Sequence, residues 1–306
     1  MSTPNFFIIG APKSGTTALA HYLSEHPQVF FAKPKELFYW SSDHPKAKER
    51  HNVFSIEDYL QYFRNSDGHV AIGEGSTNYL QSHTAIKNIL EFNPKSKFIV
   101  LLRDPVDVAY GMHGELLRHY FEDVADFETA WSLQDERANG RKIPRQCIME
   151  NQLQYKDVAS YASQLERLFD LVPDSQRRVF LFEDFANDAK GVYSKVCHFL
   201  DLDDDGRTEF PKMNPARQYR SKLIGKLYQN PPRFVEPAMK KVRRVYSNAS
   251  VPMRDWIART LSQQTPRSPL KKGFREQLQE TFRPDLERVE KMLDVKLESW
   301  YRSNGA

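Results

Sequence analysis

The chain has 306 residues, of which 40% are hydrophobic and 12% aromatic, so it can bury one large α/β core or two small ones. Its formal net charge of +4 is too small to predict nucleic-acid binding without a localised basic patch. Its two cysteines, Cys147 and Cys197, belong to no CxxC pair and no Cys/His cluster, which argues against a structural zinc site.

Short apolar runs and helical patterns alternate over the first 200 residues. The run Asn5–Gly10 predicts a strand, Lys97–Leu102 and Arg178–Phe182 predict strands buried on both faces, and Val70–Ile72 predicts a shorter strand. Helical spacing is found between and after them, at Thr16–Glu25, Ile56–Phe63, Thr84–Phe92, Val106–Leu117, Leu153–Leu171 and Ala189–Leu200. This alternation predicts an α/β fold with a central parallel sheet flanked by helices.

The pattern changes after residue 200, where a polar linker, DLDDDGRTEFPKMNP, is followed by a basic segment. Between Arg217 and Arg244 the chain carries nine lysines and arginines against one acid, Glu236. This charge suits an anionic nucleotide, an acidic glycan or a membrane surface, and a solvated helix face explains it equally well. The ending predicts two helices divided by Pro284. We expect a single domain, 1–306, with an α/β core at 1–200 and a basic linker with C-terminal helices at 201–306.

The N-terminal segment MSTPNFFIIGAPKSG lacks the basic and long apolar regions of a signal peptide, because Pro12 and Lys13 interrupt its apolar run. No other stretch approaches the roughly 20 apolar residues of a membrane span. We therefore expect a soluble, cytoplasmic protein without a membrane span, and peripheral membrane contact through the basic segment stays open. The sequence does not indicate an oligomeric state.

The loop GAPKSGTT, between the first predicted strand and helix, has the composition of an anion-binding site. Such a loop offers unpaired backbone N–H groups and the positive end of a helix dipole. Gly10 and Gly15 permit tight turns. The side chains that can donate to an anion are those of Lys13, Ser14, Thr16 and Thr17. A Walker loop needs lysine directly after the second glycine, where Thr16 stands here, and a turn without any ligand is the alternative.

Four segments, in order, resemble the sulfotransferase family. PKSGTT with LAHYLSEHPQV is similar to the segment that binds the 5'-phosphosulfate of 3'-phosphoadenosine 5'-phosphosulfate (PAPS), and LLRDPVDVAYGMHGELLRH resembles the 3'-phosphate segment. FLFEDFANDAKGVYSKVCHFLDL is similar to the strand and helix that close the sheet. LQETFRPDLERVEKMLDVKLESW resembles the ending of the carbohydrate-directed branch, which includes heparan sulfate sulfotransferases and bacterial relatives. The resemblance implies the sulfotransferase fold, a P-loop-like parallel sheet with a C-terminal helical extension.

The resemblance also implies an enzyme that transfers the sulfuryl group of PAPS to a hydroxyl or amine of a carbohydrate or glycoconjugate. The product would be 3'-phosphoadenosine 5'-phosphate (PAP), and we expect no metal requirement and no nucleic-acid partner. Lys13 would stabilise the charge that develops on the 5'-phosphate, within a cradle formed by Ser14, Gly15, Thr16 and Thr17. Arg103 would hold the 3'-phosphate at the carboxyl edge of the sheet, or would instead be a structural partner of Asp104 or Asp107.

Glu36, in FFAKPKELFYW, resembles the glutamate that deprotonates the acceptor in carbohydrate sulfotransferases. Lys33 and Lys35 flank it, so an ordinary surface Glu/Lys pairing is the alternative. Glu74, in GEGSTNYL, is interpreted either as a residue that orients or contacts the acceptor or as a buried structural carboxylate.

The chain departs from the family pattern at three positions. Gly111 stands where the family has a serine that shares the 3'-phosphate, and its backbone is the remaining donor there. Phe38 stands in place of a histidine, and Gly75 in place of a lysine. A basic loop with Arg267, Lys271 and Lys272 has no clear alignment, and we interpret it as solvated.

Two alternative functions stay open at this point. One is a P-loop phosphotransferase, which would need Mg²⁺ and normally a lysine where Thr16 stands. The other is a nucleotide- or glycan-binding module without catalytic activity, which the substitutions at Gly111, Phe38 and Gly75 suggest.

Overall fold

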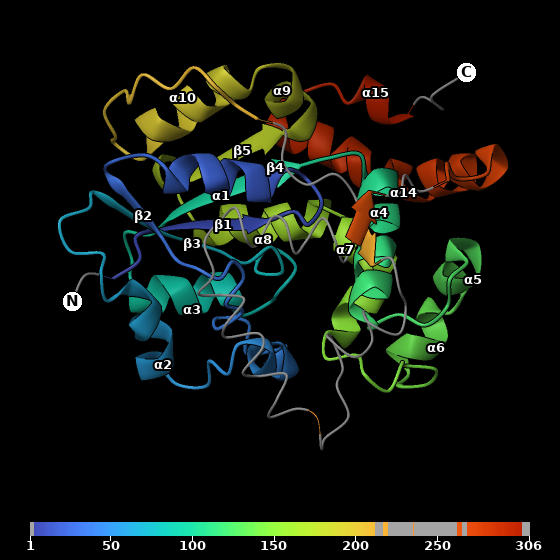
Figure 1. Ribbon diagram of the computed structural model, residues 1–306. Coiled ribbons are helices and arrows are strands. Elements are labelled where there is room, and N and C mark those ends of the chain that lie inside the picture. Colours follow the sequence, from blue (N-terminus) through green and yellow to red (C-terminus); the bar gives the residue numbers. More distant parts are fainter. Residues whose placement is uncertain (1–2, 212–216, 220–234, 236–261, 265–267, 302–306) are drawn as a thin grey trace. The chain divides into compact units, whose positions relative to one another are not determined.

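The computed structural model describes residues 3–211, 217–219, 235, 262–264 and 268–301 (Figure 1). The chain forms two compact units. Unit 1 comprises 1–112, 148–213 and 271–306, so it contains the C-terminal helices and the predicted α/β core 1–200 except for 113–147. Unit 2 comprises 113–147 and 214–270.

A parallel sheet forms the centre of unit 1, as the sequence predicts, and it has five strands in the order β2-β3-β1-β4-β5. The strands are β1 (Phe6–Gly10), β2 (Val29–Phe31), β3 (Ala71–Gly75), β4 (Lys97–Leu102) and β5 (Arg177–Leu181). Every residue of β1 is buried, as expected for a central strand that is covered on both faces.

Helices cover both faces of this sheet (Figure 1). One face carries α1 (Thr16–Ser24), α9 (Phe182–Asn187) and α10 (Ala189–Phe199), and the other carries α3 (Ala85–Phe92) and α8 (Ala162–Leu171). Helix α4 (Pro105–His119) begins in unit 1 and ends in unit 2. The remaining elements of unit 1 are η1 (Pro45–Arg50), α2 (Ile56–Leu60), η2 (Gln61–Phe63), η3 (Glu150–Leu153), α7 (Tyr155–Ala159), η4 (Asp174–Gln176), α14 (Lys272–Leu293) and α15 (Glu298–Tyr301).

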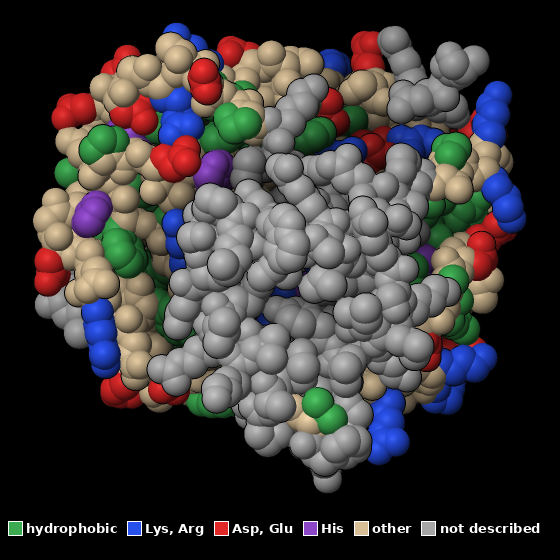
Figure 2. All heavy atoms as spheres, viewed as in Figure 1, with side chains coloured by type: hydrophobic (Ala, Val, Ile, Leu, Met, Phe, Trp, Pro, Cys, Tyr) green, Lys and Arg blue, Asp and Glu red, His purple; other side chains and the backbone are tan. Residues whose placement is uncertain are grey.

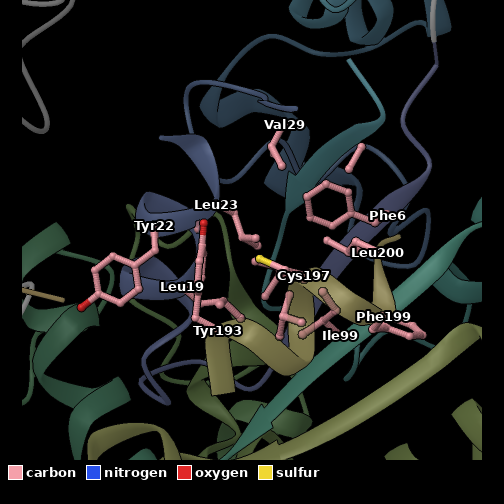
Figure 3. Packing of buried hydrophobic residues seen from close by; sticks show 14 of the residues in the cluster. Phe6, Leu19, Tyr22, Leu23, Val29, Ile99, Tyr193, Cys197, Phe199 and Leu200 are labelled. Atoms are coloured by element: carbon pink, nitrogen blue, oxygen red, sulfur yellow. The ribbon is translucent and has the colours of Figure 1, made fainter. Parts of the chain in front are cut away.

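The face under α1 and α10 packs an apolar cluster that fixes α1 on the sheet (Figure 3). Phe6 and Ile99 from the sheet meet Leu19 and Leu23 from α1. Cys197 lies among them, and burial raises the pKa of its thiol to about 11, so it is an inert core residue. The cluster therefore holds the first turn of α1 at the carboxyl end of β1.

The expected helix Leu153–Leu171 is wrong, because the chain forms η3, α7 and α8 there instead. Ser160 leaves the helical conformation, with φ −88° and ψ 114°. The carboxylate of Asp285, on α14, then accepts hydrogen bonds from the backbone N–H groups of Tyr161 (2.7 Å) and Ala162 (3.1 Å). A residue distant in sequence thus satisfies the first amides of α8, which defines where that helix begins.

The expected division of the C-terminal segment at Pro284 is also wrong, because α14 continues through this proline. Leu278, Phe282, Leu286 and Val289 are all buried, so one apolar face runs along the helix on both sides of Pro284. Burying these side chains contributes about 1.5–3 kcal/mol each, which offsets the roughly 3 kcal/mol that an interior proline costs.

Unit 2 contains α5 (Phe127–Ser132), α6 (Gln134–Ala138) and the antiparallel pair β6 (Arg217–Tyr219) and β7 (Ser262–Gln264). A bidentate ion pair is buried in it. The two terminal nitrogens of Arg137 lie 2.6 and 2.7 Å from the carboxylate oxygens of Glu122, and both side chains are at most 1% exposed.

Apart from β6 and Val235, the predicted basic segment 217–244 lies outside the described residues, as does Arg267. On the coloured part of the face in Figure 2, basic and acidic side chains are interspersed. Within the described ranges, every helix is too short or too polar to cross a lipid bilayer.

Candidate active site

The loop between β1 and α1, residues 10–17, forms a cradle at the carboxyl edge of the sheet. Gly15 has φ 84°, in the left-handed region that favours glycine, and lies directly before the first turn of α1. Lys13 also has a positive φ, 63°, which is uncommon for lysine and is typical of constrained functional loops. Among the described residues no side chain caps α1, so its first backbone amides can serve an anion.

The hydroxyl residues of the cradle differ in exposure. Ser14 is fully buried and donates to the carbonyl of Pro12 (3.4 Å), whereas Thr17 is exposed. Thr16 is 3% exposed and accepts a hydrogen bond from Lys35. Lys13 is exposed, so its ammonium group can reach a ligand.

Arg103 follows β4 and lies against the cradle. It donates to the carbonyl oxygen of Lys13 (3.2 Å) and to Asp107 (3.0 Å), and its guanidinium lies 4.5 Å from the ring centroid of Phe182. Its side chain is 31% exposed, so it is held in place and is still accessible. The pairing with Asp107 foreseen as an alternative is present, in a geometry that also brings Arg103 to the phosphate loop.

An arginine on α14 supports the turn that carries Arg103. Arg275 pairs with Asp104 (2.5 Å) and with Asp107 (2.9 Å), and its side chain is 16% exposed. Asp104 also caps the start of α4 by accepting from the N–H of Val106 (2.8 Å). Burial, and then the nearby Asp107 carboxylate, raise the pKa of Asp104 to about 6, against the opposing effect of Arg275.

Gly111 lies on α4 against the side chain of Lys13. A Cβ atom at this position would be 3.1 Å from Lys13 Cγ and 3.3 Å from Lys13 Cβ. The absence of a side chain therefore leaves room for the stem of Lys13, and the structure brings Lys13, Arg103 and Gly111 together.

Glu36 lies in the loop after β2 and is connected to the cradle by hydrogen bonds. Its Oε1 atom accepts from the Thr77 hydroxyl (2.8 Å) and from the Lys35 ammonium (3.1 Å). Lys35 also donates to Thr16 (3.3 Å). The Lys35 and Glu36 side chains are 15% and 21% exposed, so the pair is much less accessible than an ordinary surface pair.

Glu74, on β3, is the centre of a buried hydrogen-bond cluster. It is 1% exposed and accepts from the hydroxyls of Tyr59 (3.0 Å), Tyr79 (3.1 Å) and Ser76 (2.5 Å). Burial raises its pKa to about 7, although these donors oppose the effect. Glu74 is therefore a buried structural carboxylate, which was one of the two interpretations of this residue.

The Glu74 cluster also holds the loop that carries Glu36. Ser76 accepts from the backbone N–H of Phe38 (3.0 Å), and Tyr79 accepts from that of Trp40 (3.3 Å). Phe38 is 1% exposed, so its side chain belongs to the core.

Several contributors to this arrangement were not among the predicted site residues. Thr77 lies in GEGSTNYL, three residues after Glu74, and a hydroxyl residue so close to a candidate carboxylate could have indicated a site residue. Arg275 gave no local signal, because its partner Asp107 is 168 residues away in sequence.

Lys271 and Lys272 are exposed at the start of α14. Within the described part of the chain, no three His, Cys, Asp or Glu side chains converge on a metal-binding point.

Comparisons with known proteins point to one family. Residues 3–222 match the family model described as the sulfotransferase domain. A membrane-associated sulfotransferase of Dictyostelium discoideum is 34% identical over 107 residues, which cover 34% of this chain and 21% of that protein. A bifunctional heparan sulfate N-deacetylase/N-sulfotransferase of Homo sapiens is 28% identical over 206 residues, which cover 64% of this chain and 22% of that protein. The chain thus spans about a fifth of the length of these two relatives.

A solved structure shares the fold. The sulfotransferase from Alicyclobacillus acidocaldarius superposes with a TM-score of 0.71 at 23% identity, covering 99% of this chain and 100% of that one.

The expected cytoplasmic location is contradicted by these relatives. The Dictyostelium protein is membrane-associated, and the human protein acts on heparan sulfate, which together point to a non-cytoplasmic location. The expectation was wrong because it relied on apolar runs within these 306 residues, and association with a membrane does not require such a run in this part of a protein.

Proposed function

Because the chain belongs to the sulfotransferase domain family, we propose that it transfers the sulfuryl group of PAPS to a hydroxyl or amine of a carbohydrate, and releases PAP. The human relative, named for heparan sulfate, supports a carbohydrate acceptor. The observation that carries the proposal is the hydrogen-bonded connection of Glu36 to the cradle, beside Arg103. The family match gives no support to the phosphotransferase or to the inactive binding module.

Donor binding would use the two sides of the cradle. The backbone amides at the start of α1, with Lys13, would hold the 5'-phosphosulfate. The cradle hydroxyls of Ser14, Thr16 and Thr17 would line that site. Arg103 would hold the 3'-phosphate, because its contact with the Lys13 carbonyl uses only part of its donor set.

Transfer would occur between Glu36 and the cradle. The acceptor oxygen or nitrogen attacks sulfur, and its proton passes to Glu36. The bond between sulfur and the bridging oxygen breaks, and its electron pair remains on the 5'-phosphate of PAP. Lys13 and the amides of α1 stabilise that charge, which develops most strongly as the bond breaks.

Calorimetric titration with PAP tests the donor site. Lys13→Ala and Arg103→Ala should each weaken PAP binding by about 10²- to 10³-fold, as expected when a charged donor is removed from an anion site. Lys87→Ala is the control, because Lys87 is an exposed lysine on α3 with 68% of its side chain accessible. Unchanged PAP affinity in both site variants would refute the assignment of the cradle.

Glu36→Gln tests the chemical step separately from binding. This variant should bind PAP like the wild type and transfer radiolabelled sulfate to a glycan panel about 10²- to 10⁴-fold more slowly, because the proton acceptor is lost. Wild-type turnover in Glu36→Gln would exclude Glu36 as the base.

A further inference from the structure

Lys35 contacts both the cradle and the candidate base. Its Nζ atom donates to Thr16 at the start of α1 (3.3 Å) and to Glu36 (3.1 Å). Glu36 is held from its other side by Thr77 (2.8 Å). The base, the cation and the cradle therefore form one continuous chain of hydrogen bonds.

The path of Lys35 depends on Gly75 at the end of β3. In the strand order β2-β3-β1, a side chain that leaves the loop after β2 must cross the end of β3 to reach the cradle after β1. A Cβ atom at Gly75 would lie 3.0 Å from Lys35 Cε and 3.6 Å from Lys35 Cδ. Gly75 thus provides the space through which Lys35 reaches Thr16.

The charge of Lys35 lies where an anionic donor would end. Its side chain is 15% exposed, and an ion pair in such a poorly solvated place is stronger than one in bulk water. An ammonium group has three protons, and its two partners among the described residues, Thr16 and Glu36, use two of them. A PAPS molecule held by the cradle beside Thr16 would offer a sulfuryl oxygen that can accept a hydrogen bond from the third proton.

We propose that Lys35 is a second catalytic cation, whose ammonium group contacts the sulfuryl group of the bound donor. The inference rests on the proposed sulfotransferase function. While Glu36 is ionised, Lys35 is shared between the carboxylate and the sulfuryl oxygens. When Glu36 takes the acceptor proton, its negative charge disappears. Lys35 then stabilises the negative charge on the sulfuryl oxygens while sulfur passes from the bridging oxygen to the acceptor. Lys35 keeps all three protons throughout.

Comparing two nucleotides separates this role from general support of the cradle. PAP lacks the sulfuryl group, so Lys35→Met should change PAP affinity by less than about threefold, while kcat falls by about 10²- to 10³-fold, as for the loss of one transition-state donor. Affinity for PAPS, measured without acceptor, should fall more than affinity for PAP. The matched control is Lys33→Met, an exposed lysine in the same loop, which should leave all three quantities unchanged.

A second variant acts on Lys35 without changing it. Gly75→Ala places a methyl group 3.0 Å from Lys35 Cε and 3.1 Å from Phe31 Cζ, and it should lower kcat at least fivefold with PAP affinity unchanged. Melting temperatures of all variants, compared with the wild type, check that they are folded.

The outcomes distinguish the inference from the function on which it rests. If wild-type protein binds neither PAP nor PAPS, the proposed function and this inference are both refuted. If the wild type transfers sulfate and Lys35→Met has the same kcat as Lys33→Met, only the inference is refuted. An equal loss of PAP affinity and of kcat in Lys35→Met would also overturn it, because Lys35 would then belong to the phosphate cradle.

Discussion

Replacing Glu74 with glutamine is expected to change how the stability of the protein depends on pH. The carboxyl group is 1% exposed and accepts hydrogen bonds from Tyr59, Tyr79 and Ser76. Glutamine has nearly the same shape and keeps an oxygen acceptor, and it does not titrate. The variant therefore removes the ionisation of Glu74 with little change in packing.

The expected size follows from the pKa of Glu74, which burial raises from an ordinary 4.5 to about 7. Between these values the unfolded chain releases the proton and the folded protein retains it, so stability falls as the pH rises. The gap corresponds to about 3 kcal/mol, at roughly 1.36 kcal/mol per pH unit. Below pH 4.5 the group is protonated in both states, and above about pH 7 the full destabilisation is present.

Urea unfolding of both proteins from pH 4 to pH 8, followed by fluorescence, measures this effect. The unfolding free energy of the wild type minus that of Glu74→Gln should fall by about 3 kcal/mol between pH 4.5 and pH 7, and level off above it. Subtraction removes the contribution of all other titrating groups. In the Tyr59→Phe background the fall should start at the same pH and extend to higher pH, because the folded protein loses one donor to the carboxylate. A difference that stays constant across the whole range would refute the reasoning.

Two further predictions concern α14. Arg275→Met should lower the unfolding free energy by about 3 kcal/mol and weaken PAP binding, because the buried Asp104 carboxylate would lose its ion pair beside Asp107, which would then pair with Arg103 alone. Arg288→Met is the control, because Arg288 lies on the same helix and its ion pair with Glu166 of α8 is exposed. This variant should cost less than about 1 kcal/mol in the same urea measurement, and equal losses of stability in the two variants would contradict the prediction. Asp285→Ala should cost about 1–2 kcal/mol, because α8 loses its cap, and faster amide hydrogen exchange in the first turn of α8 would report it.

The parallel sheet could be predicted because its strands carry a strong local signal. β1 and β4 are continuous apolar runs that need burial on both faces, and each is followed by a helical pattern. β2 escaped prediction because it has only three residues, in a segment with proline on either side. All three of its residues pair with β3, and a run this short has no readable period.

The site was predictable where its chemistry is local. The cradle and Arg103 both follow predicted strands, and the ends of parallel strands share one edge of the sheet. The reach of Lys35 was not predictable, because it depends on the space at Gly75, 40 residues further along the chain. Asp285 could not be predicted for the same reason, since it caps a helix that begins 123 residues earlier in the sequence.

The contacts of α14 determine which fragment of this chain can be studied alone. The family match ends at residue 222, and a fragment cut there would contain the cradle, Arg103 and Glu36. It would lack Arg275 and Asp285, so Asp104 would lose its ion pair, Asp107 would keep only its pair with Arg103, and α8 would begin without its cap. We therefore expect that a recombinant fragment meant to retain the proposed donor site must extend through residue 293, and that a ribosome must synthesise α14 before the nascent protein can complete that site.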